Sequence, residues 1–174
     1  MTKSVDFYFD IVSPASYLAW MQMPKIAEET GATVNYKPFF LPGLFKVAGS
    51  ASPITIPAKS KWLFHDLKRF AKREGVKFWM NEHFPLNSLY IMRGLIAWQD
   101  KPEIKALGDG FFKAMWANNE NVNDPAVMAR IVSEAGVDPA EWKAALEDEG
   151  VKQQVFSINE DLAKRGAFGA PTFF

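Results

Sequence analysis

Residues 5–20, VDFYFDIVSPASYLAW, predict a buried strand that ends and a helix that begins directly after it. In the first half, apolar residues alternate with polar or amphipathic ones, and aromatic and β-branched side chains dominate, as is typical of strands. Ser13 followed by Pro14 indicates a helix start, because the hydroxyl can accept from a free backbone N–H and proline loses no bond there. The hydroxyl is therefore expected at the positive end of a helix, as a cap alone, the commoner role, or as part of an anion site.

The segments that follow this stretch complete a βαβ unit. The helix is expected to run from Pro14 to about Thr30, with a kink at Pro24 and a glycine just after its end. Residues 33–39 predict a second strand, and the crossover of such a unit is almost always right-handed. Residues 40–57 contain Pro-Gly and Gly-Ser pairs and predict a long irregular loop.

The pattern from residue 58 to about residue 165 is almost wholly helical. Helices are expected over 58–74 and 87–99, from 101, from 125, from 139, and from about 150 to 165. The buried face of the first of these is expected to carry Leu63, Leu67, Phe70 and Ala71. Five aromatic side chains are assigned to the core: Trp62, Phe64, Phe111, Phe112 and Trp116. Residues 168–174 begin a last apolar strand.

The composition restricts the class of protein and its partners. A chain of 174 residues with 48% hydrophobic side chains suits one domain, or one domain with an insertion. Twenty basic and twenty acidic side chains give a net charge of zero without a long basic run, which argues against nucleic acid and anionic membranes as partners. The sequence shows no leader pattern and no apolar run of membrane length, so we expect a cytoplasmic protein.

The chain contains no cysteine. It therefore cannot form a disulfide, carry out thiol redox chemistry with its own residues, or build a thiolate metal site. His65 and His83 have no partner at a spacing typical of metal ligands, so no metal site is expected. Any sulfur chemistry must use a thiol brought in from outside.

Three features together resemble one family: the strand followed by Asp-x-x-Ser-Pro-x-Ser-Tyr, the all-helical block after a βαβ unit, and Gly-Ala-Pro-Thr at 169–172. They are similar to the thioredoxin-fold branch that holds kappa-class glutathione transferases, DsbA-like oxidoreductases and 2-hydroxychromene-2-carboxylate isomerases, and residues 7–19 most resemble the isomerases. The resemblance implies an α/β thioredoxin-like fold with a large all-helical insertion. Residues 1–57 and 150–174 would form the discontinuous thioredoxin-like domain, and 58–149 the insertion. The closing strand and helix of that fold are expected to be missing from this sequence.

The resemblance also implies a glutathione site. Ser13 matches the active-site serine beside the sulfur of bound glutathione, where redox relatives hold a Cys-x-x-Cys. Pro171 matches a proline that is cis in this fold, although without the resemblance a trans bond is the expectation. Ala170 would offer its backbone to the cysteinyl part of glutathione, and Lys59 would lie near the glycine carboxylate. The related segment that binds the γ-glutamyl end would follow Phe174.

Lys46 and Phe84 fall near positions that line the second-substrate pocket in the isomerases, where Lys46 would pair with a carboxylate. By composition alone, lysines such as Lys46 and Lys59 are more often solvated than functional. Gly49-Ser50 stands where the related pattern has Gly-Asn, which leaves that contact open. The family implies a small aromatic substrate and a homodimer.

The energetics of such a site are sufficient without a basic side chain. A thiol with a pKa of about 8.5 needs a decrease of about two units, or roughly 2.7 kcal/mol, to become mainly thiolate at neutral pH. A helix N-terminus supplies about 0.3–2 kcal/mol, and a hydrogen bond to a charged acceptor adds roughly 1.5–3 kcal/mol. Ser13 is thus interpreted as a hydroxyl donor to a thiolate rather than as a nucleophile, because no His-Asp pair lies near it in sequence.

Three functions remain open at this point. The first is glutathione-dependent isomerisation of 2-hydroxychromene-2-carboxylate in aromatic catabolism, with glutathione as cofactor. The second is a kappa-like glutathione transferase or peroxidase, and the third is a glutathione- or peptide-binding module without catalysis. The serine and the isomerase-like start of the chain favour the first.

Overall fold

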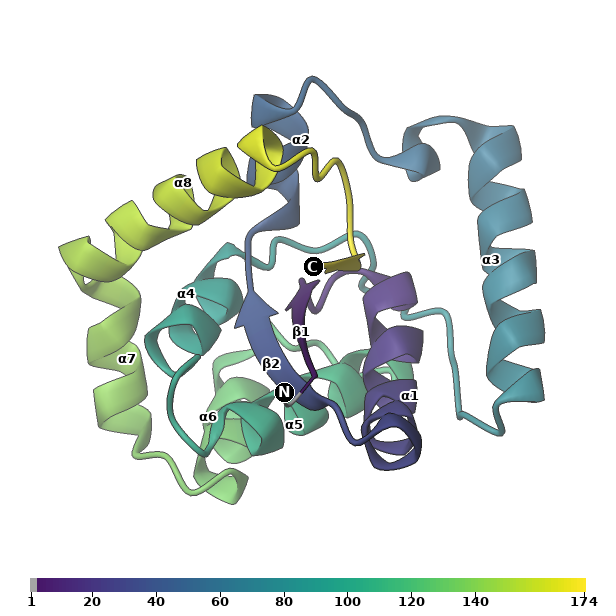
Figure 1. Cartoon of the computed structure of the whole chain (residues 1–174). Coiled ribbons are helices and arrows are strands. Elements are labelled where there is room, and N and C mark those ends of the chain that lie inside the picture. The colour runs from purple at the N-terminus through teal and green to yellow at the C-terminus, as the bar shows by residue number, and fades with distance from the viewer. Residues whose placement is uncertain (1–2) are drawn as a thin grey trace.

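A computed structural model describes residues 3–174, so the first two residues of the predicted thioredoxin-like domain lie outside the described residues. Its sheet has three strands in the order β2-β1-β3. The central strand β1 (Ser4–Phe9) runs parallel to β2 (Thr33–Pro38) and antiparallel to β3 (Thr172–Phe173). The predicted last strand therefore pairs with β1, and in Figure 1 it lies beside the start of the chain although it comes from the far end.

The helix α1 (Pro14–Thr30) connects the two parallel strands, as predicted. It continues through Pro24 and ends at Gly31, whose φ of 67° lies in the left-handed region that favours glycine. The βαβ unit predicted from residues 5–39 is thus confirmed. It places the start of α1 directly beyond the carboxyl end of β1.

The prediction of an irregular loop over residues 40–57 was wrong in part. Residues Leu41–Val47 form the helix α2, and Pro53–Thr55 form the short 3-10 turn η1. Pro42 lies in the first turn of α2, where proline is tolerated, and the buried side chains of Leu41 and Leu44 hold the helix against the rest of the molecule. The Pro42-Gly43 pair by itself favours a turn, but the burial of Leu41 and Leu44 stabilises a helix here.

Six longer helices follow: α3 (Pro57–Arg73), α4 (Leu89–Ala97), α5 (Ile104–Trp116), α6 (Pro125–Glu134), α7 (Pro139–Glu147) and α8 (Glu149–Lys164). The two Asp-Pro starts are confirmed, because the Asp124 carboxylate accepts a hydrogen bond from the Ala126 N–H and the Asp138 carboxylate accepts one from the Ala140 N–H, each at 2.8 Å. The helix expected from residue 101 begins three residues later.

The helix α3 lies at one edge of the molecule, beside α1 (Figure 1). Leu67 and Ala71 are buried and Leu63 is half-buried, as predicted for its inner face. Phe70, expected on that face, is 40% exposed beneath the guanidinium of Arg73. Trp62 is 66% exposed, so its assignment to the core was wrong. Because α3 packs mainly through one narrow face, helical spacing alone overestimates what it buries.

One hydrophobic core joins the sheet to the helical block. Phe9 of β1 lies 5.7 Å from Phe112 of α5 between ring centroids, and the indole of Trp20 donates to Asp109 at 2.6 Å. The side chains of Phe111, Phe112 and Trp116 are fully buried, as predicted, and Phe64 is half-buried at the edge of this core. No helix within residues 3–174 is both long enough and apolar enough to cross a membrane.

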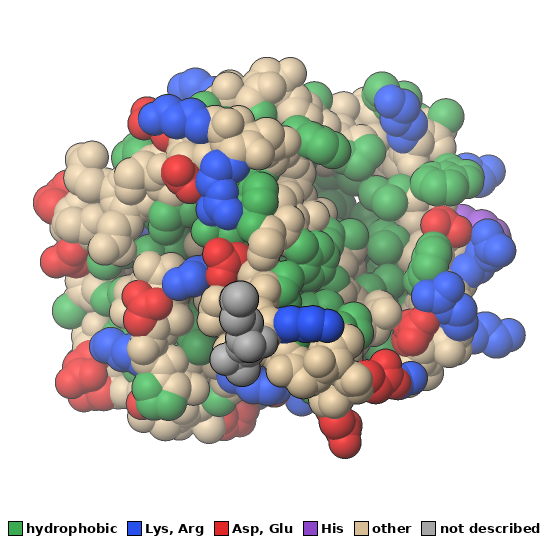
Figure 2. Space-filling view, in the orientation of Figure 1, with side chains coloured by type: hydrophobic (Ala, Val, Ile, Leu, Met, Phe, Trp, Pro, Cys, Tyr) green, Lys and Arg blue, Asp and Glu red, His purple; other side chains and the backbone are tan. Residues whose placement is uncertain are grey.

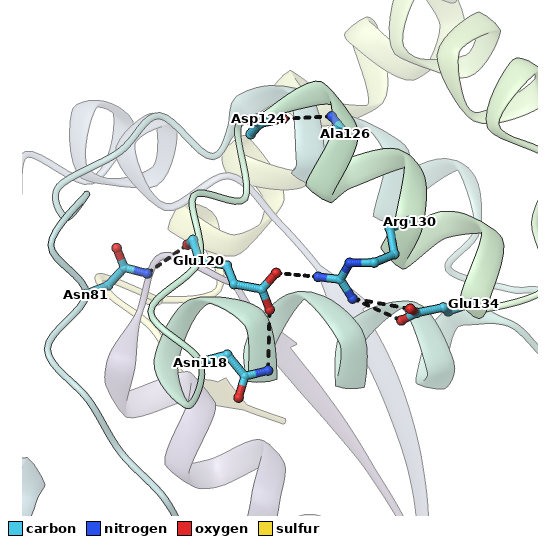
Figure 3. Close-up of polar contacts among 7 residues, drawn as sticks. All are labelled: Asn81, Asn118, Glu120, Asp124, Ala126, Arg130 and Glu134. Atoms are coloured by element: carbon cyan, nitrogen blue, oxygen red, sulfur yellow. Dashed lines mark hydrogen bonds and ion pairs between the residues drawn. The ribbon is translucent and has the colours of Figure 1, made fainter.

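Polar contacts fix the loop between α5 and α6 (Figure 3). The buried amide of Asn81 donates to the backbone carbonyls of Met115 and Glu120, at 2.8 and 2.9 Å. On the surface, Arg130 pairs with Glu120 and with Glu134. The hydrogen bonds of Asn81 hold the start of residues 81–86 against the end of α5, and that segment includes Phe84, which lines the site described next.

Candidate active site

Ser13 is the N-cap of α1. Its φ of −87° and ψ of 113° are extended, and its Oγ accepts a hydrogen bond from the Ser16 N–H at 3.1 Å. The same hydroxyl donates to the backbone carbonyl of Ala170, 157 positions away in sequence, at 3.2 Å. Ser13 is only 5% exposed. It is therefore both a helix cap and a bridge between the two ends of the chain.

The start of α1 keeps its positive character. Pro14 has no N–H, Ser16 donates to the Ser13 hydroxyl and Tyr17 donates to the Ser13 carbonyl. Among the first backbone N–H groups of α1, the Ala15 N–H remains available to bind a ligand. No acidic side chain lies in the first turn. The partial positive charge of the 17-residue helix is thus not neutralised within its own first turn, which suits an anion.

Ser13 lines a cavity of about 320 Å³. Its walls come from the start of α1, from α2, from η1 and α3, and from residues 84–86, with Ala170 beside Ser13. Among residues 3–174, the side chains that line this cavity are mostly apolar and none of them is basic. Figure 2 shows hydrophobic side chains gathered around a hollow beside α3. A cavity of this size and polarity is typical of small-molecule sites, which pair apolar walls with a few polar groups.

Asp10 lies directly behind this site and is fully buried. One carboxylate oxygen accepts from the Val12 N–H at 3.0 Å, and the other from the Leu41 N–H at 2.8 Å and the Ser88 hydroxyl at 3.0 Å. Burial raises the pKa of Asp10 to about 6, against the opposing effect of these hydrogen bonds. The carboxyl group thereby ties the starts of α2 and α4 to the end of β1.

The sequence pattern did not reveal this role of Asp10. Asp10 continues the alternation of apolar and polar residues that includes Phe7 and Phe9. This pattern is the same whether the carboxylate is exposed to solvent or is buried and hydrogen-bonded. The available signal was the position of Asp10 three residues before Ser13, at the end of an apolar strand and next to a helix start.

The structure brings together some of the predicted site residues. Ser13, Phe84 and Ala170 line the same cavity, and the Ala170–Pro171 bond is cis, as predicted. Lys59 lies in the first turn of α3 with its side chain exposed, and it does not line this cavity. Lys46 lines a different cavity, on another face of α2. The predicted grouping of Lys46 with Phe84 around one substrate is therefore not present here.

Among residues 3–174 there is no group of three or more His, Asp or Glu side chains that could hold a metal ion. The chemistry of the Ser13 cavity instead fits the thiol end of glutathione. It offers one hydroxyl and one backbone N–H at a positive helix end, next to the exposed edge formed by Ala170 and β3.

The chain matches the model of the DSBA-like thioredoxin domain over residues 4–174. It is 27% identical over 176 residues to the 2-hydroxychromene-2-carboxylate isomerase of Sphingobium xenophagum, covering 100% of this chain and 89% of that protein. It is 25% identical over 177 residues to glutathione S-transferase kappa 1 of Caenorhabditis elegans, covering 96% and 78%. A solved 2-hydroxychromene-2-carboxylate isomerase structure superposes with a TM-score of 0.86 at 25% identity, covering 98% of this chain and 84% of that one.

These matches confirm the predicted fold, an α/β thioredoxin-like sheet with a large helical block, and relatives of this kind indicate that the protein is an enzyme. The matched region includes Ser13, Ala170 and Pro171. Because this family model matches residues 4–174, nearly the whole chain, the chain belongs to the DSBA-like thioredoxin domain family.

Proposed function

We propose that this protein is a glutathione-dependent isomerase that converts 2-hydroxychromene-2-carboxylate into trans-o-hydroxybenzylidenepyruvate in the cytoplasm, as part of naphthalene-type aromatic catabolism. The observation that carries the proposal is the Ser13 hydroxyl, which lies at the N-terminus of α1, where the first turn carries no acidic side chain, and which lines an apolar cavity beside Ala170. The absence of cysteine supports a borrowed thiol as the reactive group. The Sphingobium xenophagum relative supports the choice of reaction.

Glutathione, when bound, supplies a thiolate that adds reversibly to the substrate and is regenerated. Ser13 stabilises negative charge on sulfur by rotating its hydroxyl from the Ala170 carbonyl toward the anion, while its Oγ still accepts from Ser16. The Ala15 N–H and the helix end add to this stabilisation. Together these groups replace the basic side chain that the cavity lacks.

Other residues position the ligand in this proposal. The backbone of Ala170, next to cis Pro171, holds the cysteinyl part of glutathione, and Lys59 provides a positive charge for its glycine carboxylate. Phe84 and the apolar wall exclude water from the sulfur, which strengthens electrostatic interactions inside the cavity. The aromatic ring of the substrate would lie against the same wall.

One observation favours a second candidate, a kappa-like glutathione transferase that acts on uncharged electrophiles. The hydroxychromene substrate carries a carboxylate, but no basic side chain lines the Ser13 cavity, and Lys46 lies elsewhere. An apolar electrophile has no need of such a partner. The Caenorhabditis elegans relative supports this alternative.

Absorbance changes of 2-hydroxychromene-2-carboxylate, with and without glutathione, distinguish these candidates. Conversion only with glutathione supports the isomerase. Conjugation of chlorodinitrobenzene without isomerisation supports the transferase and rejects the isomerase. Inertness in both assays, with glutathione binding retained, rejects both and identifies a binding module.

The proposal includes a homodimer as the working form. Sedimentation velocity at several protein concentrations tests this part on its own. A single species with the mass of one chain over the whole range would reject the dimer and leave the chemical proposal unaffected.

A further inference from the structure

A second cavity, of about 480 Å³, lies between α2, α4 and α8. It is larger than the Ser13 cavity and touches α2 on another face, and of the described residues Pro42 alone lines both cavities. In Figure 1 these three helices lie together, away from α3. The proposed isomerase or transferase reaction uses no residue of this cavity. Its lining must therefore be explained separately.

The walls of this second cavity combine apolar surface with positive charge. The apolar part includes Phe40, Leu89 and Val155, and the charged part consists of Lys46, Arg93 and Lys152 with one acid, Glu160. Lys152 is already paired with Glu147 and Glu149, at 3.4 and 2.8 Å. Within residues 3–174, no carboxylate lies within ion-pair distance of Lys46 or Arg93, so two cations facing this cavity have no protein counter-ion.

Arg93 is held at the cavity by its neighbours. Its guanidinium lies over the ring of Tyr90, 5.4 Å from the centroid, and its Nε is sealed from solvent without an acceptor among the described residues. A guanidinium offers several N–H donors in a planar arrangement that matches a carboxylate. The side chain is thus fixed in place with donor capacity left over.

Asn159 provides an independent observation at the same place. It lines the second cavity, is 3% exposed, and its Oδ1 has no hydrogen-bond partner among the described residues. Gly43 makes room for this amide, because a Cβ at position 43 would overlap the Asn159 Nδ2. Buried side-chain polar atoms without a partner are few in native proteins, so an amide oxygen that lacks a donor and a guanidinium nitrogen that lacks an acceptor, on two residues that line one cavity, indicate a ligand with polar groups.

We propose that the second cavity binds a small amphipathic carboxylate. Its apolar body lies against Phe40, Leu89 and Val155, and its carboxylate accepts hydrogen bonds from the Arg93 guanidinium and from the Asn159 Nδ2, because the Asn159 Oδ1 can only accept. A single planar anion fits one guanidinium and one amide, whereas the extensive apolar wall disfavours a strongly hydrated dianion such as phosphate. Binding at this site does not depend on the reaction at Ser13.

Calorimetric titration with phenylbutyrate and with the neutral phenylbutanol tests the proposal. We expect one phenylbutyrate per chain, bound roughly tenfold or more tightly than phenylbutanol, because only the ionised acid forms an ion pair with the guanidinium. Nuclear magnetic resonance gives the location, since phenylbutyrate is expected to shift the side-chain amide signals of Asn159. Equal affinity for the two compounds, or shifts confined to residues of the Ser13 cavity, would contradict the proposal.

Arg93→Gln is the variant that tests the charge, with Arg69→Gln on exposed α3 as its matched control. We expect the first to weaken phenylbutyrate binding roughly tenfold without changing phenylbutanol binding, and the second to change neither. If Arg93→Gln does not fold, Val47→Trp replaces it as the test variant. Val47 is exposed at the cavity rim, so a larger side chain there narrows the cavity and is expected to weaken phenylbutyrate binding. Unchanged phenylbutyrate affinity in a folded Arg93→Gln or Val47→Trp protein would overturn the assignment.

Discussion

Ser13 and Asp10 show two different ways in which one residue organises this site. Ser13 uses its hydroxyl twice, to cap α1 and to contact the backbone of Ala170. Asp10 uses both carboxylate oxygens to hold Val12, Leu41 and Ser88 in place. The first residue faces the cavity and the second lies behind it, so their substitution has different consequences.

Ser13→Ala is expected to raise the pKa of bound glutathione by about one to two units and to slow turnover roughly tenfold to a hundredfold, because one hydrogen bond to a charged acceptor is lost. The pKa is measured by thiolate absorbance against pH, and turnover by the isomerase or transferase assay. Ser52→Ala is the matched control, since Ser52 lines the same cavity but is not at the start of α1. An unchanged thiol pKa in Ser13→Ala would remove this residue from the mechanism.

The buried Asp10 is expected to make stability depend on pH. Its pKa is raised from 3.8 to about 6 in the folded protein, so between these values the folded chain holds a proton that the unfolded chain has released. The unfolding free energy therefore falls as pH rises through this window, by roughly 3 kcal/mol in total. Below the window Asp10 is protonated in both states and the full contribution is present.

Urea unfolding of the wild type and Asp10→Asn at several pH values tests this expectation. The variant cannot titrate at position 10, so the difference in unfolding free energy, wild type minus variant, should decrease between about pH 4 and pH 6. Contributions from other carboxylates cancel in that difference. Parallel curves for the two proteins would contradict the assignment of this pH dependence to Asp10.

At the scale of elements, α1 and α5 meet through a close contact between a glycine and an indole. Gly108 on α5 faces the ring of Trp20 on α1, and a Cβ at position 108 would overlap that ring. The indole N–H donates to Asp109 on the same helix at 2.6 Å. Helix propensity alone favours alanine over glycine, but here the packing of two buried elements opposes it.

Gly108→Ala is expected to lower the unfolding free energy by about 1–3 kcal/mol, because the cost of overpacking exceeds the propensity gain of about 1 kcal/mol. Denaturant unfolding measures the change. In the Trp20→Phe background the smaller ring leaves space, so the same substitution should cost much less. Equal costs in the two backgrounds would show that the Trp20 contact does not explain the effect.

At the scale of the whole molecule, the division into a thioredoxin-like domain and an insertion over 58–149 stays a prediction. Several contacts cross the proposed boundary: Trp116 donates to the Ile11 carbonyl at 2.8 Å, and Tyr17 donates to the Lys77 carbonyl at 2.6 Å. The largest group of buried hydrophobic side chains includes residues from both parts. The boundary therefore does not separate two independent cores.

We expect the two parts to unfold in one cooperative transition, because neither can expose its share of this core without disrupting the other. Circular dichroism and tryptophan fluorescence should give the same urea midpoint, and the calorimetric and van't Hoff enthalpies should agree. Two separated midpoints would instead identify the helical block as an independent folding unit.

The βαβ unit, most helix starts, the helix cap at Ser13 and the exclusion of cysteine chemistry could all be predicted from the amino-acid sequence, because each depends on neighbouring residues or on composition. Only the tertiary structure decided that α2 is a helix, that Trp62 is exposed and that Asp10 is buried. It also placed Ser13 beside Ala170 and moved Lys46 to a separate cavity. The physical reason is that burial and contacts across 157 positions are set by the packing of distant elements, which local spacing does not contain.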